Sequence, residues 1–183
     1  MSGGAHVDPS NKKLALLISI LALILAISET LGNGAQTKAL AANIEASNLW
    51  NFFQAKTVRM TVLRATAEAM ETESAGKPSP QAAAQIEKWR KTAERYDNEP
   101  DTNEGRKQLM ARAKSLESSR DLAMSAYHQY EIASAAVQIA IVLASSAVIT
   151  GLSALSFAAF GLGVVGVVFT LIGLFAPTAV HLF

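Results

Sequence analysis

The sequence predicts an all-α integral membrane protein with three transmembrane helices and a long antiparallel coiled-coil hairpin inserted between the first and second helices. Half of the residues are hydrophobic and only 17% are charged, against about 25% in an average soluble domain. No charged side chain occurs from Ile132 to Phe183, whereas residues 32–131 hold 14 of the 16 basic and 13 of the 15 acidic residues. In this polar segment, apolar positions alternate at steps of three and four, as in a coiled coil.

The first predicted span, residues 14–31, follows an N-terminal tail of residues 1–13. The uncharged run Leu14–Ser28 is shorter than the roughly 20 residues of a typical span, but snorkelling of Lys12 and Lys13 and the residues after Glu29 extend it. The same pattern also fits a secretory signal cleaved after Ser28. Whether residues 1–28 are ever cleaved stays open.

Two further spans are predicted at residues 132–150 and 157–176, followed by a C-terminal tail of residues 177–183. The uncharged turn Gly151–Ser156 makes them a tight antiparallel pair, and Pro177 ends the last helix. Helices in lipid associate through small residues, and we assign a face of small residues on the third span to oligomer packing. Its partner is either the second span or a neighbouring chain. The residues of this face are Ser156, Ala159, Gly163, Gly166, Thr170 and Gly173.

The polar insert, residues 32–131, is predicted to fold back on itself. Residues 76–80 form the turn, with Ser79 as helix cap and Pro80 in the first helical position, and a second break lies near Pro100, after which Asp101 can cap the next helix. That last helix is predicted to continue unbroken into the second span. Lys56 and Arg120 occupy seam positions, where a charge sets register or snorkels to the surface. The larger seam residues are Leu49, Phe53, Met60, Leu63, Met70, Leu109 and Leu116.

Several segments carry a family resemblance: Trp50–Arg59, Arg95–Asp97, Glu104–Lys107, Tyr127–Gly151, and Phe175–Pro177 with His181 and Leu182. Together they resemble an uncharacterised bacterial membrane-protein family, domain of unknown function 4337. The resemblance covers nearly the whole chain beyond residue 12. It implies a bacterial inner-membrane protein and supplies no catalytic residue.

Residues that could carry chemistry are few. Gly161–Gly166 spells GxGxxG, but it lies inside a hydrophobic span with no preceding strand, so it does not indicate a dinucleotide site. The chain has no cysteine, and its net charge of +1 excludes a nucleic-acid binder. Four residues at one predicted interface are weak metal candidates, or are merely interfacial: Glu29, His128, Glu131 and His181.

An aromatic group, Trp50, Phe52 and Phe53, either packs on the opposite arm or contacts a partner. We expect a non-enzymatic, homo-oligomeric scaffold or spacer of the bacterial inner membrane, with projecting coiled-coil arms and no cofactor. The alternatives are an accessory subunit of a larger membrane complex and a pore or transporter. The expected partners are a second copy, the lipid bilayer and, in the first alternative, that complex. The lysines before the first span favour a cytoplasmic N-terminus and a periplasmic insert.

Overall fold

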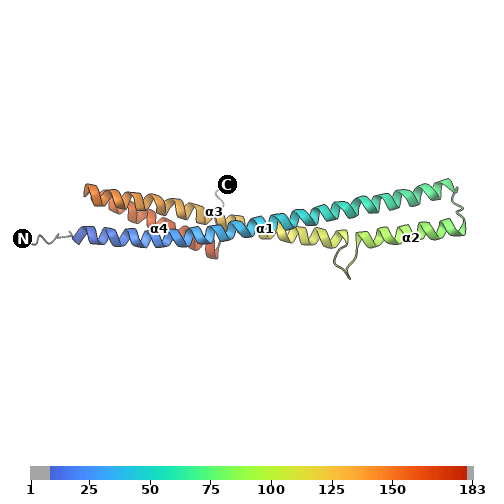
Figure 1. Cartoon of the computed structure of the whole chain (residues 1–183), viewed down its shortest axis with the longest axis horizontal. Helices are drawn as coiled ribbons and strands as arrows, with labels where there is room; N and C mark the ends of the chain where they lie inside the picture. The colour runs from blue at the N-terminus through green and yellow to red at the C-terminus, as the bar shows by residue number, and fades with distance from the viewer. Residues whose placement is uncertain (1–8, 181–183) are drawn as a thin grey trace, which may run out of the picture. The chain divides into compact units, whose positions relative to one another are not determined.

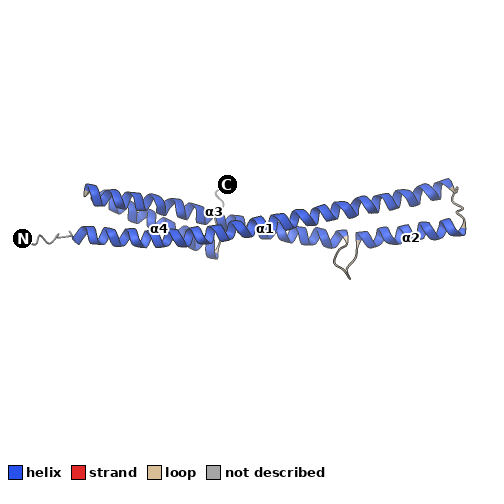
Figure 2. Ribbon diagram, viewed as in Figure 1, coloured by secondary structure: helices blue, strands red, loops and turns tan. Residues whose placement is uncertain are grey.

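The computed structural model describes residues 9–180, with side chains from residue 12 onward. Over this range the chain forms four helices and no strand (Figure 2). The helices are α1 (Pro9–Glu73), α2 (Pro80–Asp97), α3 (Arg106–Thr150) and α4 (Ser153–Phe175). The predicted all-α fold class is confirmed.

The chain divides into two compact units, and α1 and α3 contribute to both of them. The first unit contains the chain up to Ala39 together with everything from Asp121 onward, and it includes α4. The second unit contains Leu40–Arg120 and includes α2. Figure 1 shows α1 in blue to green, α2 in green, α3 in yellow to orange and α4 in red.

The first unit is a bundle of three helices. α1, α3 and α4 are each long and apolar enough to cross a membrane, as the sequence predicts. Their packed interior is built on Leu21, Val137 and Ala140. Large apolar side chains such as Phe157 and Val142 remain exposed on the outside of this bundle.

Small residues allow α4 to approach both of its neighbours closely. A Cβ on Gly163 would lie 2.7 Å from Leu21 of α1, and one on Gly166 would overlap Val137 of α3. The α4 helix therefore lies against α1 and α3 at once (Figure 1). The hydroxyl groups of Ser28 on α1 and Thr170 on α4 share a hydrogen bond of 2.8 Å, which satisfies two polar groups in the apolar bundle.

In the second unit, the later part of α1 packs against α2 and the beginning of α3. Leu49 contacts the fully buried Leu109 and Ala113 of α3. Seam positions nearer the turn are also covered, because Met60 is buried while Leu63 and Met70 are half-buried. The predicted apolar register therefore marks the side of α1 that faces its neighbours in this unit.

Helix ends differ in how well the sequence anticipates them. Ser79 caps α2 as predicted, because its side-chain oxygen accepts a hydrogen bond from the backbone N–H of Ala82. The α3 helix runs unbroken to Thr150 as predicted, but it begins at Arg106, so the expected cap at Asp101 is wrong. The turn after α3 is also shorter than expected: only Gly151, with φ +71°, and Leu152 separate it from α4.

Candidate functional site

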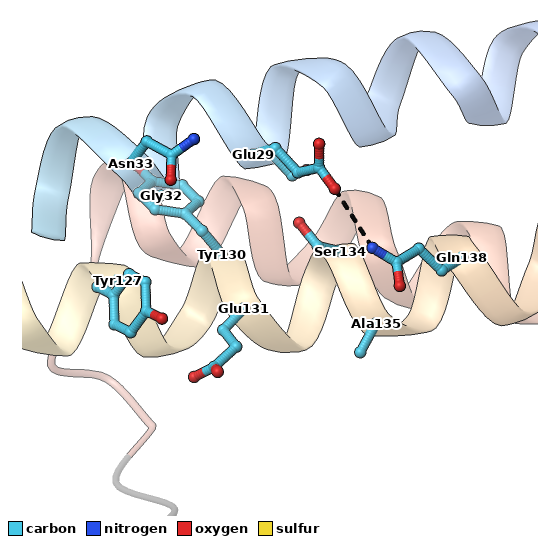
Figure 3. Close-up of a pocket in the computed structure, with 10 residues that line it drawn as sticks. Glu29, Gly32, Asn33, Tyr127, Tyr130, Glu131, Ser134, Ala135 and Gln138 are labelled. Carbon is cyan, nitrogen blue, oxygen red and sulfur yellow. Dashed lines mark hydrogen bonds between the residues drawn. The ribbon is translucent and has the colours of Figure 1, made fainter.

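A cleft of about 340 Å³ opens between α1 and α3 of the first unit (Figure 3). Many of its lining side chains are polar although the surrounding bundle is apolar. The lining includes two carboxylates, two carboxamides and four hydroxyl groups, and no basic side chain. The ten residues are Ser28, Glu29, Gly32, Asn33, Tyr127, Tyr130, Glu131, Ser134, Ala135 and Gln138.

The two carboxylates of this cleft do not converge on a common point. Glu29 accepts a hydrogen bond of 3.3 Å from the Gln138 side-chain amide. Glu131 lies 3.6 Å from the imidazole of His128, one helical turn away on the same helix. Figure 3 shows Glu29 turned toward Gln138 and the Glu131 carboxylate turned away from α1.

The metal candidates predicted from the sequence do not converge in the described part of the chain. Within residues 9–180, no three His, Cys, Asp or Glu side chains come together as a metal site would require. His128 and Glu131 form a pair, whereas Glu29 bonds to an amide instead. The fourth candidate, His181, lies outside the described residues.

Tyr130 forms the deepest aromatic wall of the cleft. Its side chain is only 5% exposed. Its ring packs directly against Gly173, where an added Cβ would lie 2.7 Å from the ring. On the α1 side, a Cβ on Gly32 would lie 3.4 Å from the Tyr130 Cβ, a less crowded approach. Burial raises the pKa of the Tyr130 hydroxyl above its usual value of 10.0, so this group stays a neutral donor at physiological pH.

Tyr130 is more deeply buried than its place beside an apolar segment predicts. Next to an apolar span, Tyr127 and Tyr130 are typical of an interfacial aromatic belt, and Tyr127 is indeed half-buried at the surface. Tyr130 is instead enclosed by helices. Gly32 and Gly173 leave room for the Tyr130 side chain. These two glycines are far apart in the sequence, and only the folded structure shows that they face the same ring.

The small face of α4 is used inside the chain. Ala159, Gly163, Gly166 and Gly173 are buried, and Thr170 is half-buried against Ser28. The structure places this face against α1 and α3 of the same chain, so the second span is one of its partners, and packing between copies stays a prediction. Ser156, at the start of the face, is half-buried.

A second polar site, which we call the Lys56 cluster, lies in the second unit and consists of Lys56, Asp97, Glu99 and Arg106. Lys56 is 5% exposed; its Nζ lies 3.2 Å from Glu99. Arg106 donates to Asp97 at 2.9 Å. The cluster fastens the loop between α2 and α3 to α1, and Lys56 is buried and paired instead of snorkelling.

Aromatic rings and a glycine complete the Lys56 cluster. The Lys56 ammonium lies 5.1 Å from the Phe52 ring centre and 5.7 Å from that of Tyr96, close enough for cation–π attraction. Gly105 is buried, and a Cβ there would lie 2.9 Å from the Asn98 Cα. Only glycine therefore fits at this point of the loop.

All three candidate aromatic residues make contacts within the second unit, Phe52 through the Lys56 ammonium. Trp50 donates a hydrogen bond of 2.8 Å to Glu117 of α3 and meets Phe53 edge-on at 5.3 Å. Phe53 also packs beside Leu49 and Leu109. Phe52 is the most exposed of the three, at 37%.

These observations define an all-helical protein in which three helices are long and apolar enough to cross a membrane. The chain belongs to the family described as domain of unknown function DUF4337, whose model matches residues 10–176. The resemblance drawn from the sequence is thereby confirmed. Three segments that carry it, Trp50–Arg59, Arg95–Asp97 and Glu104–Lys107, each contribute to the Lys56 cluster or its loop. No curated protein and no solved structure matches the chain.

Proposed function

We propose that this protein is a non-enzymatic, homo-oligomeric scaffold of the bacterial inner membrane. In this proposal residues 14–31, 132–150 and 157–176 cross the bilayer, and residues 32–131 form an antiparallel coiled-coil hairpin outside it. The charge distribution supports this division, because nearly all charged side chains fall within residues 32–131 and charged groups are costly in the hydrocarbon region.

The observation that carries the proposal is the use of polar groups in the second unit. The Lys56 cluster and the Trp50–Glu117 hydrogen bond join separate helices. Groups that are already paired across a helix interface hold that interface in one register. A stiff, braced helical unit of this kind suits a spacer or an assembly surface.

The proposal is tested by the mass of the detergent-purified complex, measured by native mass spectrometry. A complex built from repeated copies of this chain supports the scaffold. A stoichiometric foreign protein in the complex supports an accessory subunit instead, and a monomer contradicts homo-oligomerisation.

We also propose that the N-terminus is cytoplasmic and the insert periplasmic, on the strength of Lys12 and Lys13 before the first span. Ser79, which is exposed at the turn before α2, is the position to label. Because the chain has no cysteine, Ser79→Cys should react with a membrane-impermeant maleimide once the outer membrane is permeabilised. Labelling that requires lysis of the inner membrane would reverse the orientation.

A further inference from the structure

The outer side of α1 in the second unit carries an uncharged stripe, which we call the outer stripe. From Leu40 to Ala69, nine positions follow one another at steps of three or four that average about 3.6 residues, the repeat of a straight α-helix. Four of the nine are large aliphatic side chains with 53–62% of their surface exposed: Leu40, Ile44, Val58 and Val62. The other five are exposed small or amide residues: Ser47, Asn51, Ala55, Ala65 and Ala69.

The outer stripe lies opposite the side of α1 that packs within the unit. Leu49, Lys56, Met60 and Ala67 are buried on that inner side, about half a helical turn away. Neither α2 nor α3 covers the outer stripe, as its exposure shows.

Lipid is a poor candidate to cover the stripe. The same stretch of α1 carries charged and exposed side chains beside it, including Glu45, Arg59 and Arg64, and such groups are costly in the hydrocarbon region. The occupant must therefore be protein that tolerates a polar rim.

We propose that the outer stripe binds the same stripe of a second copy, with the two α1 helices parallel and in register. This inference rests on the proposed homo-oligomeric function and names the surface that it uses. In such a pair each residue faces its own counterpart, so that any charge on the stripe would meet a like charge. None of the nine positions is charged, although charged residues flank them.

The single carboxamide of the outer stripe fits the same arrangement. Asn51 lies among the apolar and small positions and faces Asn51 of the second copy in a parallel pair. An asparagine at one core position of a helical pair fixes its register and its number of strands, because misalignment leaves the carboxamide unsatisfied. Copies inserted into one membrane share one orientation, which agrees with a parallel pair.

Cross-linking of the full-length protein in detergent tests this pairing. Ala55→Cys and Ala69→Cys, made separately, should each form a covalent dimer with a short bismaleimide. Ala83→Cys, an exposed alanine on α2, is the matched control and should remain monomeric on a denaturing gel. A cross-link at Ala55 without one at Ala69 would overturn the parallel register, since an antiparallel pair that joins the two Ala55 positions separates the two Ala69 positions by roughly 40 Å.

A charge on the stripe provides an independent measurement. Val58→Glu should abolish the oligomer mass while tryptophan fluorescence still reports a folded second unit, whereas the uncharged Val58→Thr should retain that mass. An oligomer that persists in Val58→Glu, with no cross-link at either stripe cysteine, overturns the outer stripe and leaves the homo-oligomeric scaffold standing. A parent protein that is monomeric by mass overturns both.

Discussion

Removing one charge from the Lys56 cluster should destabilise the second unit strongly. In Glu99→Gln the Lys56 ammonium keeps its buried position, with 6% of the side chain exposed, but loses its nearest carboxylate. Breaking a buried pair in this way typically costs about 3–5 kcal/mol. We expect about 3 kcal/mol, the lower end of that range, because Glu104 remains 3.9 Å from the ammonium.

Removing the buried charge itself should cost much less. Lys56→Met keeps an unbranched side chain in the same space, and Glu99 keeps Arg95 at 3.6 Å. The double variant, Lys56→Met with Glu99→Gln, should therefore recover most of the loss seen in Glu99→Gln alone. That corresponds to a coupling free energy of about 2 kcal/mol between the two positions.

Tryptophan fluorescence during denaturant unfolding of the detergent-solubilised protein measures these changes. Both tryptophans, Trp50 and Trp89, lie in the second unit, so the signal reports this unit alone. Glu87→Gln is the control, because Glu87 forms only an exposed pair with Lys91, worth about 0.3–0.5 kcal/mol. If Glu99→Gln shifts the free energy of unfolding no more than Glu87→Gln, the burial argument for Lys56 is refuted.

Three further predictions concern packing and titration. Leu109→Ala, at a fully buried position, should lower the free energy of unfolding in the same fluorescence assay by about 2–5 kcal/mol, and a cost below about 1 kcal/mol would contradict the packing of this seam. Gly166→Leu should lower the thermal aggregation temperature in detergent because its side chain overlaps Val137, while the exposed Val165→Leu should not; equal temperatures would refute the close approach of α4. Burial raises the pKa of Tyr130, so its contribution to stability is complete below about pH 10 and is lost as the pH rises toward the folded-state pKa. Melting temperatures at pH 9 and pH 11 should therefore differ less in Tyr130→Phe than in the parent protein. An unchanged difference would exclude Tyr130 as the cause.

Local patterns were enough to predict the helices and much of their inner side. The apolar steps of three and four identify Leu49 and Leu109 as inward-facing, and both are buried. The cap at Ser79 was also predictable, since a serine followed by proline at a helix start bonds only to a backbone N–H a few residues further on. Such signals depend on a few consecutive turns of one chain segment.

Partners that are far apart in sequence could not be predicted in the same way. Glu117 lies beside the seam in the heptad register, yet it accepts the indole N–H of Trp50, because the side chains of two helices meet at angles that the register does not specify. Glu99 belongs to an irregular loop, and its pairing with Lys56 depends on where that loop folds back. The start of α3 at Arg106 also depends on how this loop folds back, since Gly105 packs closely against Asn98.

The short connection between α3 and α4 has a consequence for biogenesis. Only Gly151 and Leu152 separate the helices. The two segments that we propose to cross the bilayer are therefore synthesised directly one after the other, and neither would have time to insert separately. From Ile132 to Ala176 no charged side chain is present, so a pair of helices can enter the hydrocarbon as one folded element without carrying a charge across it. Lengthening this connection with charged residues should therefore slow membrane insertion before it affects the stability of the inserted protein.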